Sequence, residues 1–274
     1  EKIYPFSFRK MPKKNKKLND GEREEILIKI QLCFFRDNKI EVPNFGNIEQ
    51  VGFSTDYNKI DWSNIDIDGI KTDQKEIRNL ADKLGIKKSS SKDKADIKIN
   101  NENYSLKCTG YGKPAIVNHT NRIGWLKISK IINQDIKLLD DLIDEYWRLR
   151  IDGQIKEDCP NFHENSPFND HMDIIKPYLD FFVFKGSGQG MSEVVADKVL
   201  EFETFNNTQT WNVFANEYIQ HHWENIYFCM RSTKGMPSDY ENYEKKDVIS
   251  PWTRLFKGKK GDEKYRGALH VRVG

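Results

Sequence analysis

Residues 95–100 read Ala-Asp-Ile-Lys-Ile-Asn, and residues 103–109 read Asn-Tyr-Ser-Leu-Lys-Cys-Thr. Polar and apolar side chains alternate in both stretches, which is the pattern of two β-strands with one buried face. We expect a hairpin that turns at residues 101 and 102, in which Ile99 lies opposite Tyr104 and Asp96 lies opposite Lys107. One face is then apolar. The polar face carries Asp96, Lys98, Ser105, Lys107 and Thr109.

The polar face of this hairpin has the side chains needed to act on a phosphate. Asp96 offers the oxygen ligand that Mg²⁺ prefers, and the ion would activate a water and offset developing charge. Lys107 would orient or help to deprotonate that water and stabilise the phosphate oxygens, with Ser105 as a supporting polar group. The alternative interpretation is an ordinary amphipathic hairpin, in which a cross-strand Asp–Lys pair contributes under about 1 kcal/mol.

The rest of the chain reads as an alternation of helices and strands around this hairpin, which predicts the α/β (α+β) class with a mixed sheet. An N-cap at Asn19 and acids in the first turn predict a helix that runs to Asp37. The periodicity predicts further helices over residues 73–84, 121–133 and 135–150, from Ser192, and over 208–224. Further strands are expected over residues 115–119, 178–184, 225–231 and 268–273.

Ala95-Asp96 followed by Ser105-Leu106-Lys107 resembles the PD-(D/E)XK nuclease motif, and its SxK form is similar to that of type II restriction endonucleases. Ala95 stands where the motif has proline, and Ser105 stands where it has a second carboxylate. Residues 21–25, Gly-Glu-Arg-Glu-Glu, resemble the GxxxE pattern that precedes some of these cores. Glu25 is therefore the first choice for the missing carboxylate and Glu22 the second; the alternative role for both is compensation of the helix dipole.

The resemblance covers roughly residues 18–130 and implies a restriction-endonuclease-like mixed β-sheet flanked by helices. It implies a nuclease core over 18–150 and a specificity and dimerisation region over 151–274, after a basic arm at 1–17. The implied activity is Mg²⁺-dependent hydrolysis of double-stranded DNA at a short specific sequence by a homodimer, with Mg²⁺ held by Asp96 and Glu25. No nucleotide cofactor is expected, and the implied location is the prokaryotic cytoplasm.

Charge is distributed unevenly along the chain, although the net charge is only +2. Residues 1–17 and the stretch after residue 254 are rich in lysine and arginine, whereas residues 135–173 are acidic. Two basic ends and an acidic middle are typical of a protein with one polyanion-binding face. The alternative is a solvated surface of mixed charge.

Several polar segments could recognise DNA. Asn118 could read adenine, Arg122 could read guanine, and His119 could contact a phosphate; the alternative is that this segment caps the next helix. Residues 186–190, Gly-Ser-Gly-Gln-Gly, could cradle a phosphate before a helix at Ser192, or could form a plain turn. The remaining candidate contacts are Lys113, Ser187, Gln189, Arg231, Lys234, Arg254, Lys257, Lys259, Lys260, Arg266, His270 and Arg272.

Composition excludes several classes of protein. The chain has 274 residues, of which 37% are hydrophobic and 12% aromatic, which is enough for a packed core. No apolar run approaches the length of a membrane span, so no membrane partner is expected. The four cysteines are far apart and form no CxxC, which favours reduced intracellular thiols. Two functional alternatives stay open: a sequence-non-specific or repair nuclease of the same fold, and a non-catalytic nucleic-acid-binding protein.

Overall fold

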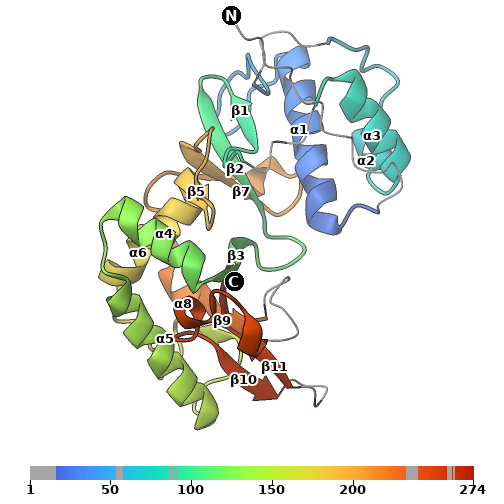
Figure 1. Ribbon diagram of the computed structural model, residues 1–274. Coiled ribbons are helices and arrows are strands. Elements are labelled where there is room, and N and C mark those ends of the chain that lie inside the picture. Colours follow the sequence, from blue (N-terminus) through green and yellow to red (C-terminus); the bar gives the residue numbers. More distant parts are fainter. Residues whose placement is uncertain are drawn as a thin grey trace, which may run out of the picture.

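The computed structural model describes residues 17–53, 58–86, 89, 92–232, 240–257, 261 and 263–274. The helices and strands form two lobes, and each lobe contains a four-stranded sheet (Figure 1). The protein is therefore a mixed α and β structure, as the sequence predicted. The predicted basic arm at 1–17 lies outside the described residues except for Lys17.

Helix α1 (Asp20–Asn38) begins where the sequence predicted. The Asn19 side chain accepts a hydrogen bond from the Glu22 backbone N–H, and the Glu22 carboxylate accepts one from the Asn19 backbone N–H. This capping box satisfies two backbone donors that the helix itself leaves unpaired. Together with α3 (Gln74–Lys83), which the sequence also predicted, α1 packs against the apolar face of the hairpin.

Strands β1 (Ile97–Ile99) and β2 (Glu102–Cys108) form the expected hairpin in a different register. Ile97, and not Ile99, lies opposite Tyr104. The predicted pairing is therefore two residues out of step, and the expectation that Asp96 lies opposite Lys107 is wrong. Because side chains alternate with a period of two, this shift leaves every side chain on its predicted face.

The turn residues explain the register. The turn occupies residues 100 and 101, with Asn100 in the left-handed region at φ 52°. Asparagine adopts this conformation more readily than most residues. The Asn100 side-chain oxygen also accepts hydrogen bonds from the backbone N–H groups of Glu49 and Gln50 at 2.8 and 3.3 Å. Contacts from a distant segment therefore select this turn over the neighbouring one.

Strand β7 (Lys198–Phe202) lies parallel to β2, and β8 (Asn212–Phe214) lies antiparallel to β7. The first sheet is therefore mixed, with the order β1-β2-β7-β8. The predictions of helices from Ser192 and over 208–224 are wrong. Residues 198–202 pair with a strand some ninety positions earlier, and a local pattern does not report such pairing. The predicted helix over 208–224 is replaced by short elements, which are η2 (Thr208–Thr210), β8, α7 (Tyr218–His221) and η3 (Trp223–Asn225).

The second sheet is antiparallel, with the order β3-β12-β9-β4. Its three longer strands were predicted, and they are β3 (Ala115–Asn121), β9 (Ile226–Arg231) and β12 (Ala268–Val273). The short edge strand β4 (Cys159–Pro160) lies in a segment predicted to be a loop. Helices α4 (Arg122–Ile132) and α5 (Ile136–Ile151) occupy the predicted positions and pack against this sheet.

The predicted strand over 178–184 is wrong, because this segment is helical. Helix α6 (Met172–Asp180) continues directly into a π-helical turn, η1 (Phe181–Lys185). Phe181, Phe182, Val183 and Phe184 are all buried. In a short run of apolar residues that are all buried, the spacing of apolar and polar residues does not distinguish a strand from a helix.

The remaining elements are short. They are α2 (Ile67–Ile70), β5 (Gly186–Ser187), β6 (Gly190–Met191), η4 (Tyr240–Asn242), α8 (Lys246–Ile249), β10 (Arg254–Lys257) and β11 (Glu263–Arg266). β5 and β6 pair as a small hairpin, and β10 and β11 form another.

Two hydrophobic clusters divide the chain differently from the expected boundary at residue 150. One cluster joins residues 27–106 to residues 200–211 and fills the first lobe. The other joins residues 116–199 to residues 218–273 and fills the second. Strand β3 and helices α4 and α5 thus belong with the C-terminal part of the chain, while β7 and β8 complete the N-terminal sheet.

Candidate active site

The polar face of the β1–β2 hairpin fixes the Asp96 carboxylate at the start of β1. Its Oδ2 accepts hydrogen bonds from the Leu106 backbone N–H at 2.8 Å and from the Ser105 hydroxyl at 3.3 Å. Ser105 is almost fully buried, with 1% of its surface exposed. Both hydrogen bonds go to the same oxygen, so Oδ1 is the oxygen of Asp96 that can take a cation.

Lys107 extends from the same face of β2. Its Nζ donates a hydrogen bond to the Ala115 carbonyl at 3.0 Å, at the point where β3 begins. Burial lowers the pKa of the Lys107 amine, and the nearby carboxylates of Asp96 and Glu25 raise it in part. The structure therefore brings both predicted metal-binding carboxylates into the electrostatic environment of the predicted catalytic lysine.

The three glutamates of the first helical turns have different surroundings. Glu22 belongs to the capping box, which agrees with the alternative role that the sequence offered for it. Glu24 is buried and accepts a hydrogen bond from the Phe205 backbone N–H, and burial raises its pKa. Glu25 is 28% exposed at its side chain, and its Oε1 lies 2.8 Å from Lys29 Nζ. Glu25 is therefore the better placed of the two predicted carboxylates.

Two side chains near Lys107 were missed by the sequence reasoning. Burial and repulsion from Lys107 lower the pKa of the Lys94 amine to about 7, against the opposing effect of Asp96. Glu201 is paired with Lys107 in the parallel register of β2 and β7, and it is 9% exposed. Its Oε2 lies 3.0 Å from His222 Nε2. No pattern in the sequence signals Glu201, because the pairing of β2 with β7 is long-range.

Asp96 and Glu25 carry the oxygen donors that Mg²⁺ prefers, and one Glu25 oxygen is paired with the buried Lys29. Within the described ranges, no three His, Cys, Asp or Glu side chains come together as a metal cluster. Mg²⁺ is usually held by one or two carboxylates together with water and substrate phosphates, and does not need a cage of protein ligands. Asp96 and Glu25 would supply the two carboxylates, and Ser105 positions the first of them.

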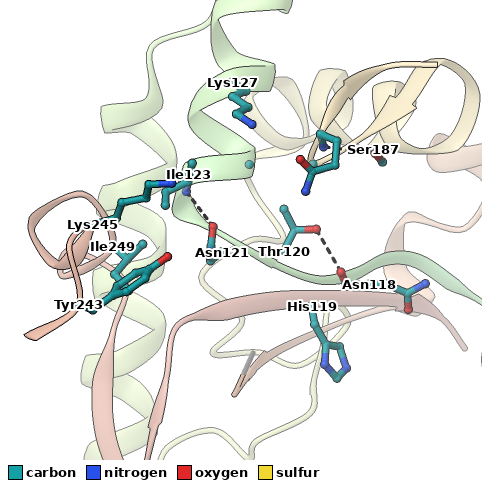
Figure 2. A pocket seen from close by; sticks show the side chains of 13 residues that line it. Asn118, His119, Thr120, Asn121, Ile123, Lys127, Ser187, Tyr243, Lys245 and Ile249 are labelled. Carbon is teal, nitrogen blue, oxygen red and sulfur yellow. Dashed lines mark hydrogen bonds between the residues drawn. The ribbon is translucent and has the colours of Figure 1, made fainter. Parts of the chain in front are cut away.

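Four of the predicted recognition residues meet at one pocket of about 500 Å³. Asn118 and His119 line it from β3, with the His119 ring turned away from Thr120, and Ser187 and Gln189 line it from the turn between β5 and β6 (Figure 2). These two segments are about seventy positions apart in the sequence. The prediction that residues 186–190 lead into a helix is wrong, so the alternative of a plain turn describes them, but this turn forms a wall of the pocket.

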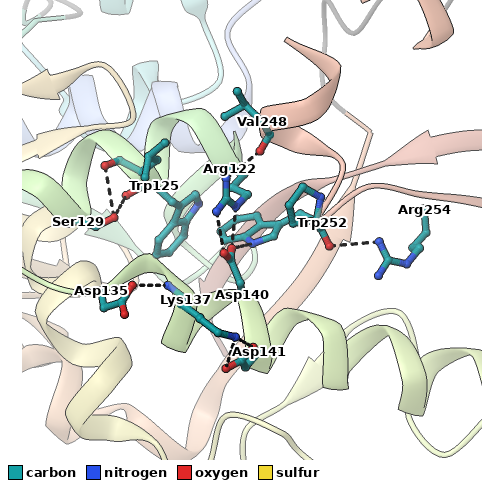
Figure 3. Close-up of polar contacts among 12 residues, drawn as sticks. Arg122, Trp125, Ser129, Asp135, Lys137, Asp140, Asp141, Val248, Trp252 and Arg254 are labelled. Atoms are coloured by element: carbon teal, nitrogen blue, oxygen red, sulfur yellow. Dashed lines mark hydrogen bonds and ion pairs between the residues drawn. The ribbon is translucent and has the colours of Figure 1, made fainter.

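Arg122 is held within the protein. Its Nε and Nη2 each donate a 2.7 Å hydrogen bond to Asp140, and its Nη1 donates one to the Val248 carbonyl (Figure 3). The Trp252 indole N–H also donates to Asp140. The Arg122 side chain is only 14% exposed. The Arg122 guanidinium is therefore engaged within the protein, and its role in reading guanine stays a prediction.

Other predicted arginine contacts are paired with the acidic stretch. Arg266 lies 2.8 Å from Glu157, Arg272 lies 2.6 Å from Asp158, and Arg231 contacts both acids at 3.3 and 3.4 Å. Arg254 similarly lies 2.8 Å from Asp144. Acids of the stretch 135–173 therefore neutralise several of the basic side chains expected to contact DNA.

The remaining candidates are dispersed. His270 stacks edge-on against His119 with 4.7 Å between ring centroids. Lys113 Nζ lies 3.7 Å from the centre of the Tyr227 ring, and Lys257 is exposed on β10. Lys234, Lys259 and Lys260 lie outside the described residues.

Burial, together with the nearby His119, Arg272 and Arg231, lowers the pKa of His270 to about 4. The His270 ring is therefore neutral at physiological pH. A neutral ring contributes no charge toward a phosphate, although it keeps its capacity for hydrogen bonds.

All four cysteines lie in the described ranges, and each is a free thiol. None of the helices that the structure describes has the length and apolar character to cross a membrane. No family model matches the chain, and the comparisons with curated proteins and with solved structures also find no match.

Proposed function

We propose that this chain is a Mg²⁺-dependent type II restriction endonuclease that hydrolyses phosphodiester bonds of double-stranded DNA at a short specific sequence. The observation that carries the proposal is that Asp96, Ser105 and Lys107 share the polar face of the β1–β2 hairpin, where Ser105 donates a hydrogen bond to Asp96 and the carboxylates of Asp96 and Glu25 act electrostatically on Lys107. The mixed sheet with helices beside it supports the same proposal.

Each residue of the site would have a separate role in hydrolysis. A bound Mg²⁺ would lower the pKa of a coordinated water and offset the negative charge that develops on the phosphate. Asp96 and Glu25 would hold the ion, and the hydrogen bonds from Leu106 and Ser105 keep the Asp96 carboxylate in place. Lys107 would orient the attacking water and contact a phosphate oxygen, and its lowered pKa favours a share in removing the proton.

The decisive experiment is digestion of unmethylated phage DNA with Mg²⁺ by the wild type and by Asp96→Asn and Lys107→Ala variants. Asparagine keeps an oxygen that can accept the Leu106 hydrogen bond, so this variant removes charge and preserves the fold. Lys98→Gln is the matched control, because Lys98 lies on the same face of the hairpin. We expect cleavage in the wild type and the control, and none in the two site variants.

The pattern of products separates the proposal from its alternatives. Discrete bands that both site variants lose support a site-specific enzyme, whereas a smear that both lose indicates a non-specific or repair nuclease. DNA binding that is salt-dependent but indifferent to Mg²⁺ and to Asp96→Asn, without cleavage, would indicate a non-catalytic binding protein. A homodimer is part of the proposal, and sedimentation equilibrium at assay concentration measures it.

A further inference from the structure

The pocket at the end of β3 has three walls from distant parts of the chain. β3 and the first turn of α4 form one wall, the β5–β6 turn forms the second, and the segment around Tyr243 and Lys245 forms the third (Figure 2). Two of these walls are in close contact, since a Cβ atom on Gly124 would come within 3.1 Å of Gly188. The pocket is thus a product of the tertiary fold, and its volume of about 500 Å³ is in the range of small-molecule sites.

The pocket lining combines positive charge with hydrogen-bonding groups. Lys127 and Lys245 are the charged residues among the described residues of the lining, and Lys245 Nζ lies 3.5 Å from the carboxylate of Glu244, which is outside the lining. Asn118, Asn121 and Gln189 bring amide groups, each of which both donates and accepts hydrogen bonds. His119 leaves β3 on the opposite side from Thr120, toward His270, and contributes little to the interior (Figure 2).

This chemistry matches a nucleotide. Side-chain amides form paired hydrogen bonds with the edges of nucleobases, and the ammonium groups of Lys127 and Lys245 favour a phosphate group. The ring of Tyr243 lines the same pocket and offers an aromatic surface. A purely apolar ligand would leave these amides and ammonium groups without partners.

The position of the pocket relative to Lys107 also fits a nucleic-acid substrate. Lys107 Nζ contacts Ala115 at the beginning of β3, and the pocket lies three to six residues further along that strand. At roughly 3.3 Å per residue, the separation is about 10–20 Å. Base pairs along a duplex follow one another at about 3.4 Å, so this distance corresponds to a few nucleotides.

We propose that this pocket binds a single nucleotide, with the amides at the base edge and Lys127 and Lys245 at its phosphate. The inference rests on the proposed function, because we expect the bound nucleotide to be one that is turned out of the DNA duplex that reaches Lys107. A free mononucleotide presents the same chemistry, and the test separates the two sources.

The test uses the full-length protein without divalent metal. Isothermal titration with each of the four deoxynucleoside 5′-monophosphates measures binding, with the deoxynucleosides and inorganic phosphate as partial ligands. The pocket variant is Lys127→Gln/Lys245→Gln. The control is Lys130→Gln/Lys137→Gln, which removes the same charge from exposed positions outside the pocket. Melting curves verify that both variants are folded.

We expect at least one monophosphate to bind saturably to the wild type, with its affinity reduced tenfold or more in the pocket variant and less than twofold in the control. Gln189→Ala should weaken the monophosphate and leave inorganic phosphate unaffected. The proposal is overturned if no monophosphate binds at millimolar concentration, or if both double variants lose the same affinity.

A duplex that carries 2-aminopurine identifies the source of the nucleotide. An emission increase that the wild type produces and the pocket variant does not would assign the pocket to an extrahelical nucleotide. Mononucleotide binding with unchanged duplex emission would assign it to a free nucleotide. Asp96→Asn should bind nucleotides like the wild type, so a failure of the nuclease proposal would appear in the cleavage assay and not in this titration.

Discussion

Lys107 in the first sheet and Arg272 in the second both lie near carboxylates, but only Arg272 is held in a direct ion pair. Lys107 donates its hydrogen bond to a backbone carbonyl, while Asp96 is held by Leu106 and Ser105. Arg272 lies 2.6 Å from Asp158. A paired cation has little charge left for a ligand, whereas an amine destabilised by burial gains from the approach of an anionic phosphate. Among the described residues, the Lys107 amine is therefore free of a direct carboxylate partner, whereas the Arg272 guanidinium is held by one.

The largest effect should come from removal of Lys107. We expect Lys107→Ala to reduce the cleavage rate by about 10²–10⁴-fold, the usual contribution of a positioned acid–base group. The cleavage rate of the wild type should rise with pH and level off below pH 10.5, the ordinary pKa of lysine, because burial lowers the pKa of Lys107. Steady-state cleavage of a supercoiled plasmid between pH 6 and 10 measures both effects. Unchanged activity in the alanine variant would remove Lys107 from the mechanism.

Arg122 provides the next test, because its contacts in the structure are those of a stabilising residue. Arg122→Ala leaves Asp140 partly buried with only Trp252 as a strong donor. We expect the free energy of unfolding to fall by about 2–3 kcal/mol, as measured by urea denaturation. Arg122→Lys should recover part of this loss, since it keeps the charge. A variant of normal stability with altered DNA specificity would contradict this interpretation.

His270 tests the packing of the second sheet through pH. Its pKa is about 4 in the folded protein against an ordinary 6.5. The unfolded chain therefore binds a proton that the folded protein excludes, and stability decreases as pH falls from 6.5 toward 4. Because of this group, the free energy of unfolding should be about 1–2 kcal/mol lower at pH 5 than at pH 7.5. His270→Gln should reduce the pH dependence of the unfolding free energy by that amount, and the exposed His221→Gln should leave it unchanged.

The smallest effect concerns the acids that pair with the second-sheet arginines. Glu157→Gln/Asp158→Asn would release Arg231, Arg266 and Arg272 from their ion pairs. We expect duplex affinity to rise by roughly five- to tenfold at low salt, with a steeper dependence on salt concentration. The matched control is Asp141→Asn/Asp152→Asn, which changes the same charge at exposed positions. Equal gains in both variants would mean that net charge alone is responsible.

The sequence predicted the features that depend on neighbouring residues. The Asn19–Glu22 capping box set the start of α1, and the alternation over residues 95–109 placed Asp96, Ser105 and Lys107 on one face of a hairpin. Helices α4 and α5 and strands β3, β9 and β12 follow from equally local periodicity. These features could be read because each is encoded within a few positions of the chain.

Other features required partners from elsewhere in the chain. The hairpin register depends on Asn100 and its contacts to residues 49 and 50, and β7 is a strand because it pairs with β2. The pairing of Arg122 with Asp140 likewise has no signature in either segment. Sequence reasoning treated each basic residue as available, since it has no information on which acid a helix or loop will bring within 4 Å.

The sequence by itself therefore determined which residues are candidates for the proposed chemistry and which face of the hairpin they occupy. Only the tertiary structure decided whether those residues are available. The alternation of polar and apolar residues in strands and the capping of helices depend on residues only a few positions apart, so the sequence shows them directly. Burial of Lys107, neutralisation of the second-sheet arginines and the nucleotide-sized pocket arise from long-range packing, whose free energy is shared among distant segments and has no local pattern.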